Sequence, residues 1–158
     1  MASQVEISNA AIISVGGDII SSLDELTPEA ISINAIWNQT RKTLLRENIW
    51  NFSVKRVELA QSATSPIFDF TYRYALPSDF LRLIQVYDDT NYKIERGFVI
   101  SNNSSCKVKY VSDVTDVNEW TSDFADAMSA RFAAEISYSI TKDINMSRML
   151  WSIYDNKM

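Results

Sequence analysis

The 158-residue sequence contains no histidine and only one cysteine, Cys106. The missing histidine excludes the Ser-His and Cys-His pairs of nucleophilic enzymes and every metal site built on imidazole. The single cysteine excludes an intrachain disulfide and a cysteine metal cluster. We interpret Cys106 as a structural or incidental thiol, because the chain offers no histidine to activate it.

Glycine and proline are also scarce, with three of each, so long flexible linkers are not expected. No apolar run reaches the roughly 18 residues that a membrane-spanning helix needs, and we expect no membrane partner. The first basic residue is Arg41, so the N-terminus lacks the basic start of a secretory signal. Length and composition predict one globular domain over residues 1–158.

Basic residues are absent from the first 40 positions, which hold five acids, namely Glu6, Asp18, Asp24, Glu25 and Glu29. The formal net charge of −5 therefore arises in this part of the chain. Elsewhere the basic residues occur only as pairs such as Arg41-Lys42 and Lys55-Arg56, and no patch that would grip phosphate is visible. Tight nucleic-acid binding is not expected. An acidic surface past which DNA slides is compatible with this pattern.

Carboxylates are the candidate chemistry that remains, because two of them can hydrolyse a glycosidic bond. Asp88 and Asp89 are adjacent, and a second group consists of Asp113, Asp116, Glu119 and Asp123. The second group does not match the calcium-loop pattern, and Gly16-Gly17 lacks the spacing and the lysine of a phosphate loop. Solvated loops and helix caps are the favoured interpretation of both groups. We predict no catalytic, cofactor or metal site.

Four helices follow from caps and periodicity. Ser3 and Glu6 have capping-box spacing and predict a helix over residues 4–15, with Val5, Ile12, Ile13 and Val15 as apolar contacts and Gly16 after its end. Thr27-Pro28-Glu29 predicts a second start and a helix over 28–47. Two further helices are expected over 122–141 and 146–156. The first of these carries an i, i+4 ridge of Phe124, Met128, Phe132, Ile136 and Ile140.

A β lobe is expected over residues 53–111. Alternating aromatics predict a half-buried strand from Phe68 to Leu76, stopped by Pro77. Ser78 or Asp79 is expected to cap a short helical turn that carries Phe80, Leu81 and Leu83. The strand of residues 54–60 is expected to point Val57 and Leu59 inward and to have a bulge near Lys55. Further strands are predicted at residues 83–87, 92–95, 98–100 and 107–111. The fold class is therefore α+β, a bundle of N- and C-terminal helices with an inserted antiparallel β lobe.

Three stretches of the chain resemble the head-to-tail adaptor proteins of tailed bacteriophages, the group that includes tail tubular protein A. They read LLRENIWNFSVKR, YALPSDFLRLIQV and VKYVSDVTDVNEWTSDFADAMSARFAAEISYSIT, in the order of the family. The resemblance implies a structural virion protein without catalysis, built from a helical bundle and a β lobe. Copies of it would form a ring, typically twelve-fold, under the portal protein in the neck of the virion. The ring would join the capsid to the next tail or nozzle protein and let double-stranded DNA pass through its lumen.

The resemblance also raises the question of which residues make contacts. We expect exposed aromatics near the β lobe and the helix ends to form the interface, namely Trp50, Phe52, Tyr87, Tyr92 and Trp120, although each could equally be core. Family members usually continue past the last helix with a polar tail that embraces the portal, whereas this sequence stops at Asp155-Asn156-Lys157-Met158. Either the portal contact is built differently or the tail is missing. The alternative function is a peptidoglycan-cleaving tail protein that uses carboxylates such as Asp116 and Glu119.

Overall fold

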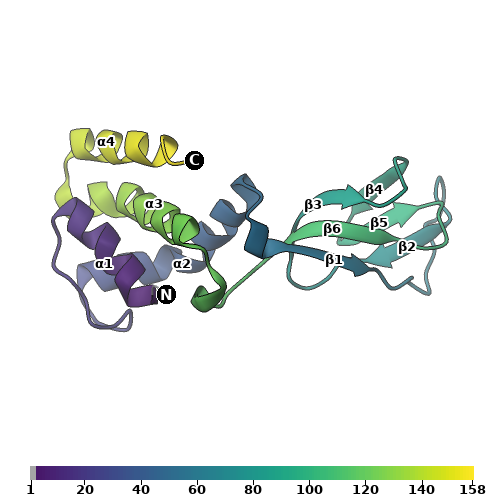
Figure 1. The fold of residues 1–158 in the computed structure, drawn as a ribbon, viewed down its shortest axis with the longest axis horizontal. Helices are drawn as coiled ribbons and strands as arrows, with labels where there is room; N and C mark the ends of the chain where they lie inside the picture. The colour runs from purple at the N-terminus through teal and green to yellow at the C-terminus, as the bar shows by residue number, and fades with distance from the viewer. Residues whose placement is uncertain (1–2) are drawn as a thin grey trace. The chain divides into compact units, whose positions relative to one another are not determined.

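The structure is a computed structural model that describes residues 3–158 of the protein. Within this range it contains four α-helices and two three-stranded antiparallel sheets, which confirms the predicted α+β class (Figure 1). The chain divides into two compact units. The helical unit consists of residues 3–48 and 114–158, and the β unit of residues 49–113 is inserted between them.

The helices begin and end close to the predicted positions. Their bounds are Gln4–Val15 for α1, Pro28–Glu47 for α2, Ser122–Thr141 for α3 and Ile144–Asp155 for α4. The Ser3 hydroxyl accepts a hydrogen bond from the Glu6 N–H at 3.2 Å, and the Glu6 carboxylate accepts one from the Ser3 N–H at 2.6 Å. These bonds form the predicted capping box. Gly16 follows α1 with φ of 75°, a left-handed conformation that glycine adopts without steric cost.

The last helix begins two residues before its predicted start. The Asp143 carboxylate accepts hydrogen bonds from the N–H groups of Asn145 and Met146, at 2.8 and 3.3 Å. Asp143 is therefore the N-cap, and α4 starts at Ile144. Two short 3-10 helices complete the list, namely η1 (Asn51–Ser53) at the start of the β unit and η2 (Val117–Glu119) in the helical unit after it.

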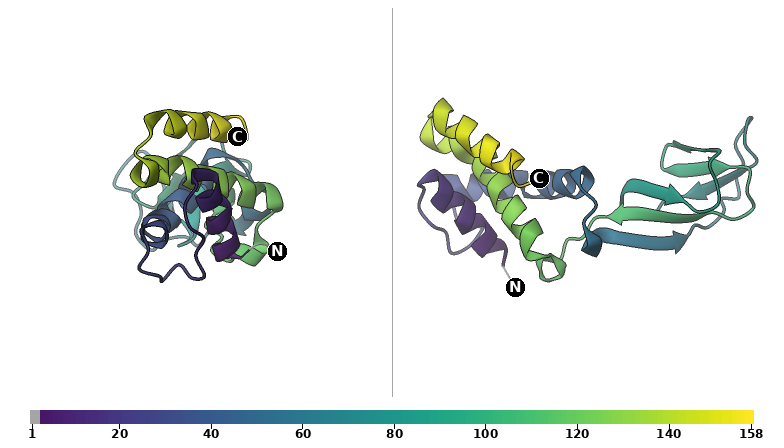
Figure 2. Two further views of the ribbon diagram at one scale, coloured as in Figure 1. Left: turned by 90° about the vertical axis from the view of Figure 1, so that its left-hand side faces the viewer. Right: turned by 45° about the horizontal axis from the view of Figure 1, so that its top comes forward.

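Helix α3 lies at the centre of the helical unit and packs against α1, α2 and α4 (Figure 2). Four members of its predicted ridge are buried, namely Phe124, Met128, Phe132 and Ile136. The ridge was found from sequence because side chains four residues apart share one face of a helix.

The buried face of α1 was predicted only in part. Ile12 and Val15 are buried as expected, and Val5 is half-buried. Ile13 is 65% exposed, so its assignment to the core was wrong. Ile13 is rotated by about 100° from Ile12 around the helix axis, and only one of the two can face α3.

The β unit contains six strands in two sheets. Their bounds are Val54–Glu58 for β1, Tyr72–Ala75 for β2, Phe80–Val86 for β3, Tyr92–Glu95 for β4, Phe98–Ser101 for β5 and Lys107–Ser112 for β6. The strand orders are β1-β6-β3 and β2-β5-β4, and all neighbours are antiparallel. One buried cluster combines Tyr74 and Val99 of the second sheet with Val108 and Tyr110 of the first. The two sheets therefore share a core.

The long aromatic strand was predicted correctly only in its second half, where β2 lies. Asp69 has a φ of 69°, and the Phe70 N–H donates to the Phe68 carbonyl at 2.9 Å. These two features bend the chain before the strand begins. Phe68 consequently lies outside the sheet and is 75% exposed. Alternation of aromatic residues alone could not reveal this local bend.

The helical turn predicted after Pro77 was wrong, because Phe80, Leu81 and Leu83 belong to β3. Asp79 was expected as a possible cap. Its carboxylate instead accepts hydrogen bonds from the Lys55 ammonium at 2.7 Å and the Tyr110 hydroxyl at 3.0 Å. Partners on β1 and β6 thus occupy the side chain that would have capped a helix.

Two expectations for β1 were also wrong. Residues Val54–Glu58 pair with β6 in an unbroken register, so no bulge occurs near Lys55, and the irregular pairings lie in β3 instead. Val57 is 38% exposed, because β1 is an edge strand with β6 as its neighbour in the sheet. Leu59 is buried as expected.

Candidate functional site

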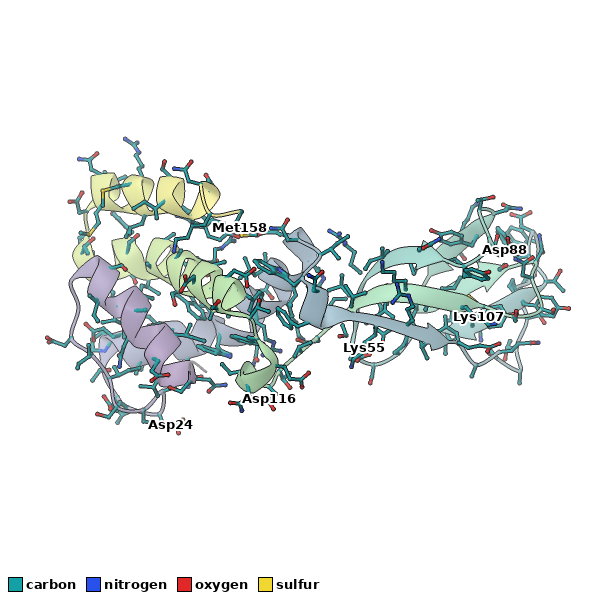
Figure 3. All side chains as sticks on the ribbon, in the orientation of Figure 1. Asp24, Lys55, Asp88, Lys107, Asp116 and Met158 are labelled. Carbon is teal, nitrogen blue, oxygen red and sulfur yellow. The ribbon has the colours of Figure 1, made fainter. Side chains whose placement is uncertain are left out.

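The predicted carboxylate groups serve mainly as caps and loop contacts. Asp116 caps η2, where its carboxylate accepts hydrogen bonds from the backbone and side-chain N–H groups of Asn118, both at 2.9 Å (Figure 3). A hydrogen bond with the Thr121 side chain lowers the pKa of Asp123 despite a small opposing effect of burial. A glycosidase needs a general acid with a raised pKa, which is the opposite shift. Glu119 is exposed at the end of η2.

The Asp88-Asp89 pair has a similar local role in the turn between β3 and β4. Asp88 has a φ of 55°, and its carbonyl accepts a hydrogen bond from the Asn103 side chain. The Asp89 carboxylate accepts bonds from the Asn91 N–H, at 2.8 Å, and from the Ser101 hydroxyl. Among residues 3–158 no group of three acidic, cysteine or histidine side chains is placed to hold a metal ion.

The Cys106 thiol belongs to the core of the β unit. Cys106 is only 1% exposed. Burial, with a smaller contribution from the negative charge of Asp89, raises the pKa of the thiol to about 11. The thiolate is the reactive form of cysteine, so this environment makes the side chain unreactive.

Trp120 was expected at an exposed interface, but it is buried at 8% exposure, and that expectation was wrong. Its ring stacks on Trp37 with centroids 6.1 Å apart and meets the Phe124 ring edge-on at 4.8 Å. The indole N–H donates to the Val114 carbonyl at 3.1 Å. The turn that contains η2 folds this side chain back against α2 and α3.

The other four predicted interface residues belong to the β unit. Tyr87 follows β3 directly and is 69% exposed, which makes it available for contact. Trp50 and Phe52 are half-buried beside η1. Tyr92 of β4 is half-buried and packs against the shared core. Of this set, Tyr87 is the aromatic side chain most open to a partner.

Sequence analysis missed the most exposed apolar side chains of the described chain. Ile67 is 98% exposed in the loop between β1 and β2, and Leu26 is 92% exposed in the connection between α1 and α2. Ile67 directly follows Pro66, and Leu26 directly precedes Thr27-Pro28. Proline and polar residues at such positions are a sequence signal for a protruding loop. Exposed apolar groups that are contiguous mark contact surfaces, and Ile67 is followed by Phe68, which is 75% exposed.

A surface on the connection between α1 and α2, here called the acidic turn, consists of Asp24, Glu25, Leu26 and Glu29. The Glu25 carboxylate accepts hydrogen bonds from the N–H groups of Ser21 and Ser22, at 2.7 and 3.0 Å. The Leu23 carbonyl accepts a further bond from the Asn34 side chain at 3.3 Å, which attaches the turn to α2. Internal hydrogen bonds therefore hold Leu26 out in solvent among acidic groups.

A second surface lies on the sheet of β1, β6 and β3, over a hollow of about 430 Å³. We call it the basic sheet face, and its members are Arg56, Glu58, Tyr87, Lys107 and Lys109. The pairing of β1 with β6 places Arg56 directly opposite Lys109. The search for basic runs along the sequence missed this patch because its cations come from strands far apart in the chain.

No protein-family model matches the chain, and no curated protein matches it. Among the described helices, none combines the length and the apolar character that crossing a membrane requires.

Proposed function

We propose that the protein is a structural component of a tailed-phage virion, a head-to-tail adaptor that forms a ring under the portal. The observation that carries the proposal is the exposure of large apolar side chains on both units, with Leu26 on the helical unit and Ile67 and Tyr87 on the β unit. Burying apolar surface is favourable, and a ring subunit needs separate surfaces for its neighbours and for the components above and below it.

The sequence supports the same proposal through the three stretches that resemble the adaptor family. The first runs from the end of α2 into β1, the second runs from the end of β2 through all of β3, and the third runs from β6 through α3. The α+β architecture is the one that the resemblance implies. Catalytic residues are not needed for this role, because the protein would act by holding partners in place.

The proposed partners are further copies of this chain, the portal protein and the next tail or nozzle protein. Double-stranded DNA would contact the ring only in transit through its lumen. The protein would be made in the host cytoplasm and would function in the neck of the virion.

The experiment that tests this function is native mass spectrometry of the chain alone and after mixing with portal rings from the same source. We expect a discrete gain of about twelve copies on each portal ring, by analogy with the closed rings that heterologous contacts produce. A chain that stays monomeric in both conditions, with its fold intact by circular dichroism, would refute the proposal. Portal rings from an unrelated phage serve as the control for adventitious binding.

A further inference from the structure

We propose that neighbouring copies in the ring contact each other through the acidic turn of one copy and the basic sheet face of the next. The inference rests on the proposed function, because it names the contact between subunits of that ring. The two surfaces differ, so the contact is heterologous, and each copy carries one of each. Repetition of such a contact closes a ring when the rotation between copies allows it.

The acidic turn has the form of a preorganised contact. Leu26 is 92% exposed, and the bonds from Ser21 and Ser22 to Glu25 order the backbone before any partner arrives. Ordering in the free subunit reduces the entropy lost on binding. Asp24 is exposed beside Leu26 and points away from the helices in Figure 3. Within residues 3–158 its carboxylate has no ion-pair or hydrogen-bond partner.

The basic sheet face has the complementary chemistry. Arg56 and Lys109 are direct cross-strand neighbours, and like charges at such positions disfavour the pairing of their strands. Neither cation forms an ion pair inside the part of the chain that the structure describes. Lys107 extends the patch along β6 and lies directly opposite Glu58, so the face carries three cations and one carboxylate (Figure 3). An acidic partner would relieve the repulsion between Arg56 and Lys109.

The composition of the basic sheet face favours a protein over DNA as its occupant. Tyr87 supplies an exposed aromatic ring beside the cations, and the Glu58 carboxylate on the same face would repel phosphate. Tyrosine and arginine are enriched at protein–protein hot spots. The acidic turn offers the apolar Leu26 for the Tyr87 ring and carboxylates for Arg56 and Lys109.

The distribution of charge over the two units agrees with this assignment. The helical unit carries 13 acidic and 7 basic residues, whereas the β unit carries 7 acidic and 8 basic residues. Contacts between the helical unit of one copy and the β unit of another are therefore favoured electrostatically over contacts between two helical units. Complementary charge also raises the rate of association and sets the register of the contact.

The test uses two charge reversals, Asp24→Lys and Arg56→Glu, in the full chain and under the condition in which the unaltered chain assembles. Each variant alone places like charges in every contact, and we expect at least a tenfold rise in the concentration needed for assembly. A 1:1 mixture of the two variants should recover assembly. Its copies can alternate so that the new lysine meets the new glutamate and Asp24 meets Arg56. The Asp24→Lys/Arg56→Glu double variant should recover it as well.

The 1:1 mixture of the two variants distinguishes a contact between two copies from a contact within a single chain. A contact within one chain would be restored in the double variant but not in the mixture, and that pattern would overturn the inference. Asp18→Lys and Lys93→Glu are matched controls, because both residues are exposed and lie outside the two surfaces. Circular dichroism of each variant establishes that the fold is retained.

Two further outcomes distinguish the inference from the function on which it rests. If the unaltered chain forms rings and neither reversal changes their assembly, the inference is wrong and the ring function stands. If the unaltered chain never assembles, with or without portal, the ring function itself is wrong. If Arg56→Glu abolishes retention on double-stranded DNA but leaves ring assembly unchanged, the basic sheet face serves DNA, and the inference is again overturned.

Discussion

Tyr154 connects three helices through one buried hydroxyl, and its replacement by phenylalanine tests the account of the helical unit. The residue lies on α4 and is 3% exposed. Its hydroxyl donates a hydrogen bond to the carboxylate of Glu47 at the end of α2. Arg131 of α3 lies over the Tyr154 ring, 5.0 Å from its centroid, and donates to Glu135 at 2.6 Å. The hydroxyl therefore takes part in a network that holds α4 against the rest of the unit.

The Tyr154→Phe substitution keeps the ring and removes only the hydroxyl. A hydrogen bond to a charged acceptor contributes about 1.5–3 kcal/mol to the free energy of unfolding. Each kcal/mol corresponds to roughly 2–4 °C in the melting temperature of a chain of this size. We therefore expect the melting temperature of the helical unit to fall by several degrees at neutral pH.

The same network predicts how the effect depends on pH. Burial, together with the hydrogen bond and negative charge of Glu47, raises the pKa of Tyr154, and the opposing effect of Arg131 is smaller. The phenol of an unfolded chain has a pKa of about 10. Since the folded pKa is higher, the contribution of the hydroxyl is complete below about pH 10 and is lost as the pH rises through the folded pKa. The variant lacks this ionisation, so its deficit should shrink above about pH 10.

Thermal and urea unfolding, both followed by circular dichroism at 222 nm, measure the melting temperature and the free energy of unfolding, because all four α-helices of the described chain belong to the helical unit. Tyr138→Phe is the matched control, since Tyr138 is 54% exposed on α3. We expect the control to be within about 0.5 kcal/mol of the unaltered protein. Equal losses in both variants, or no loss in Tyr154→Phe at pH 8, would refute the reasoning.

Two further predictions concern the β unit. The Cys106 thiol is buried and its pKa is raised to about 11, so in the native chain it should be inert to an aromatic disulfide reagent at pH 8. In urea the thiol should react fully. Fast reaction of the native chain would contradict its burial. Burial pushes the pKa of Asp79 upward, but hydrogen bonds from Lys55 and Tyr110 and the charge of Lys55 outweigh it, so the net pKa is lowered. Asp79→Asn should therefore destabilise the β unit by about 1 kcal/mol at pH 7. This stabilisation is complete above the unfolded pKa of about 3.9 and is lost as the pH falls through the lower folded pKa, so the difference should shrink in acid. A deficit that stays constant as the pH falls from 7 into this range would contradict the role of the carboxylate.

The helices were predicted well because their signals are local. The Ser3–Glu6 capping box and the Thr27-Pro28 start act within one helical turn, and both are present in the structure. The ridge of α3 follows from the period of the helix. Each of these signals lies within a few residues of the element that it specifies, so no distant part of the chain had to be known.

The β unit was predicted less accurately because a strand depends on its partner. The alternation around Phe68 has the period of a strand, yet Asp69 bends the chain, and pairing with β5 begins only at Tyr72. The local sequence makes Asp79 a possible helix cap. In the fold its carboxylate instead accepts hydrogen bonds from Lys55 and Tyr110, which are distant in sequence.

Local patterns and composition were enough to place the first three helices and the inserted β lobe and to exclude histidine-based chemistry, because each depends on neighbouring residues or on the residue types present. Which side chains are available for contact depends instead on the packing of distant segments. Trp120 became part of the core, Leu26 was left in solvent, and the pairing of β1 with β6 brought Arg56 beside Lys109. Exposure and cross-strand proximity are properties of chain segments that meet after folding, and no local pattern specifies them.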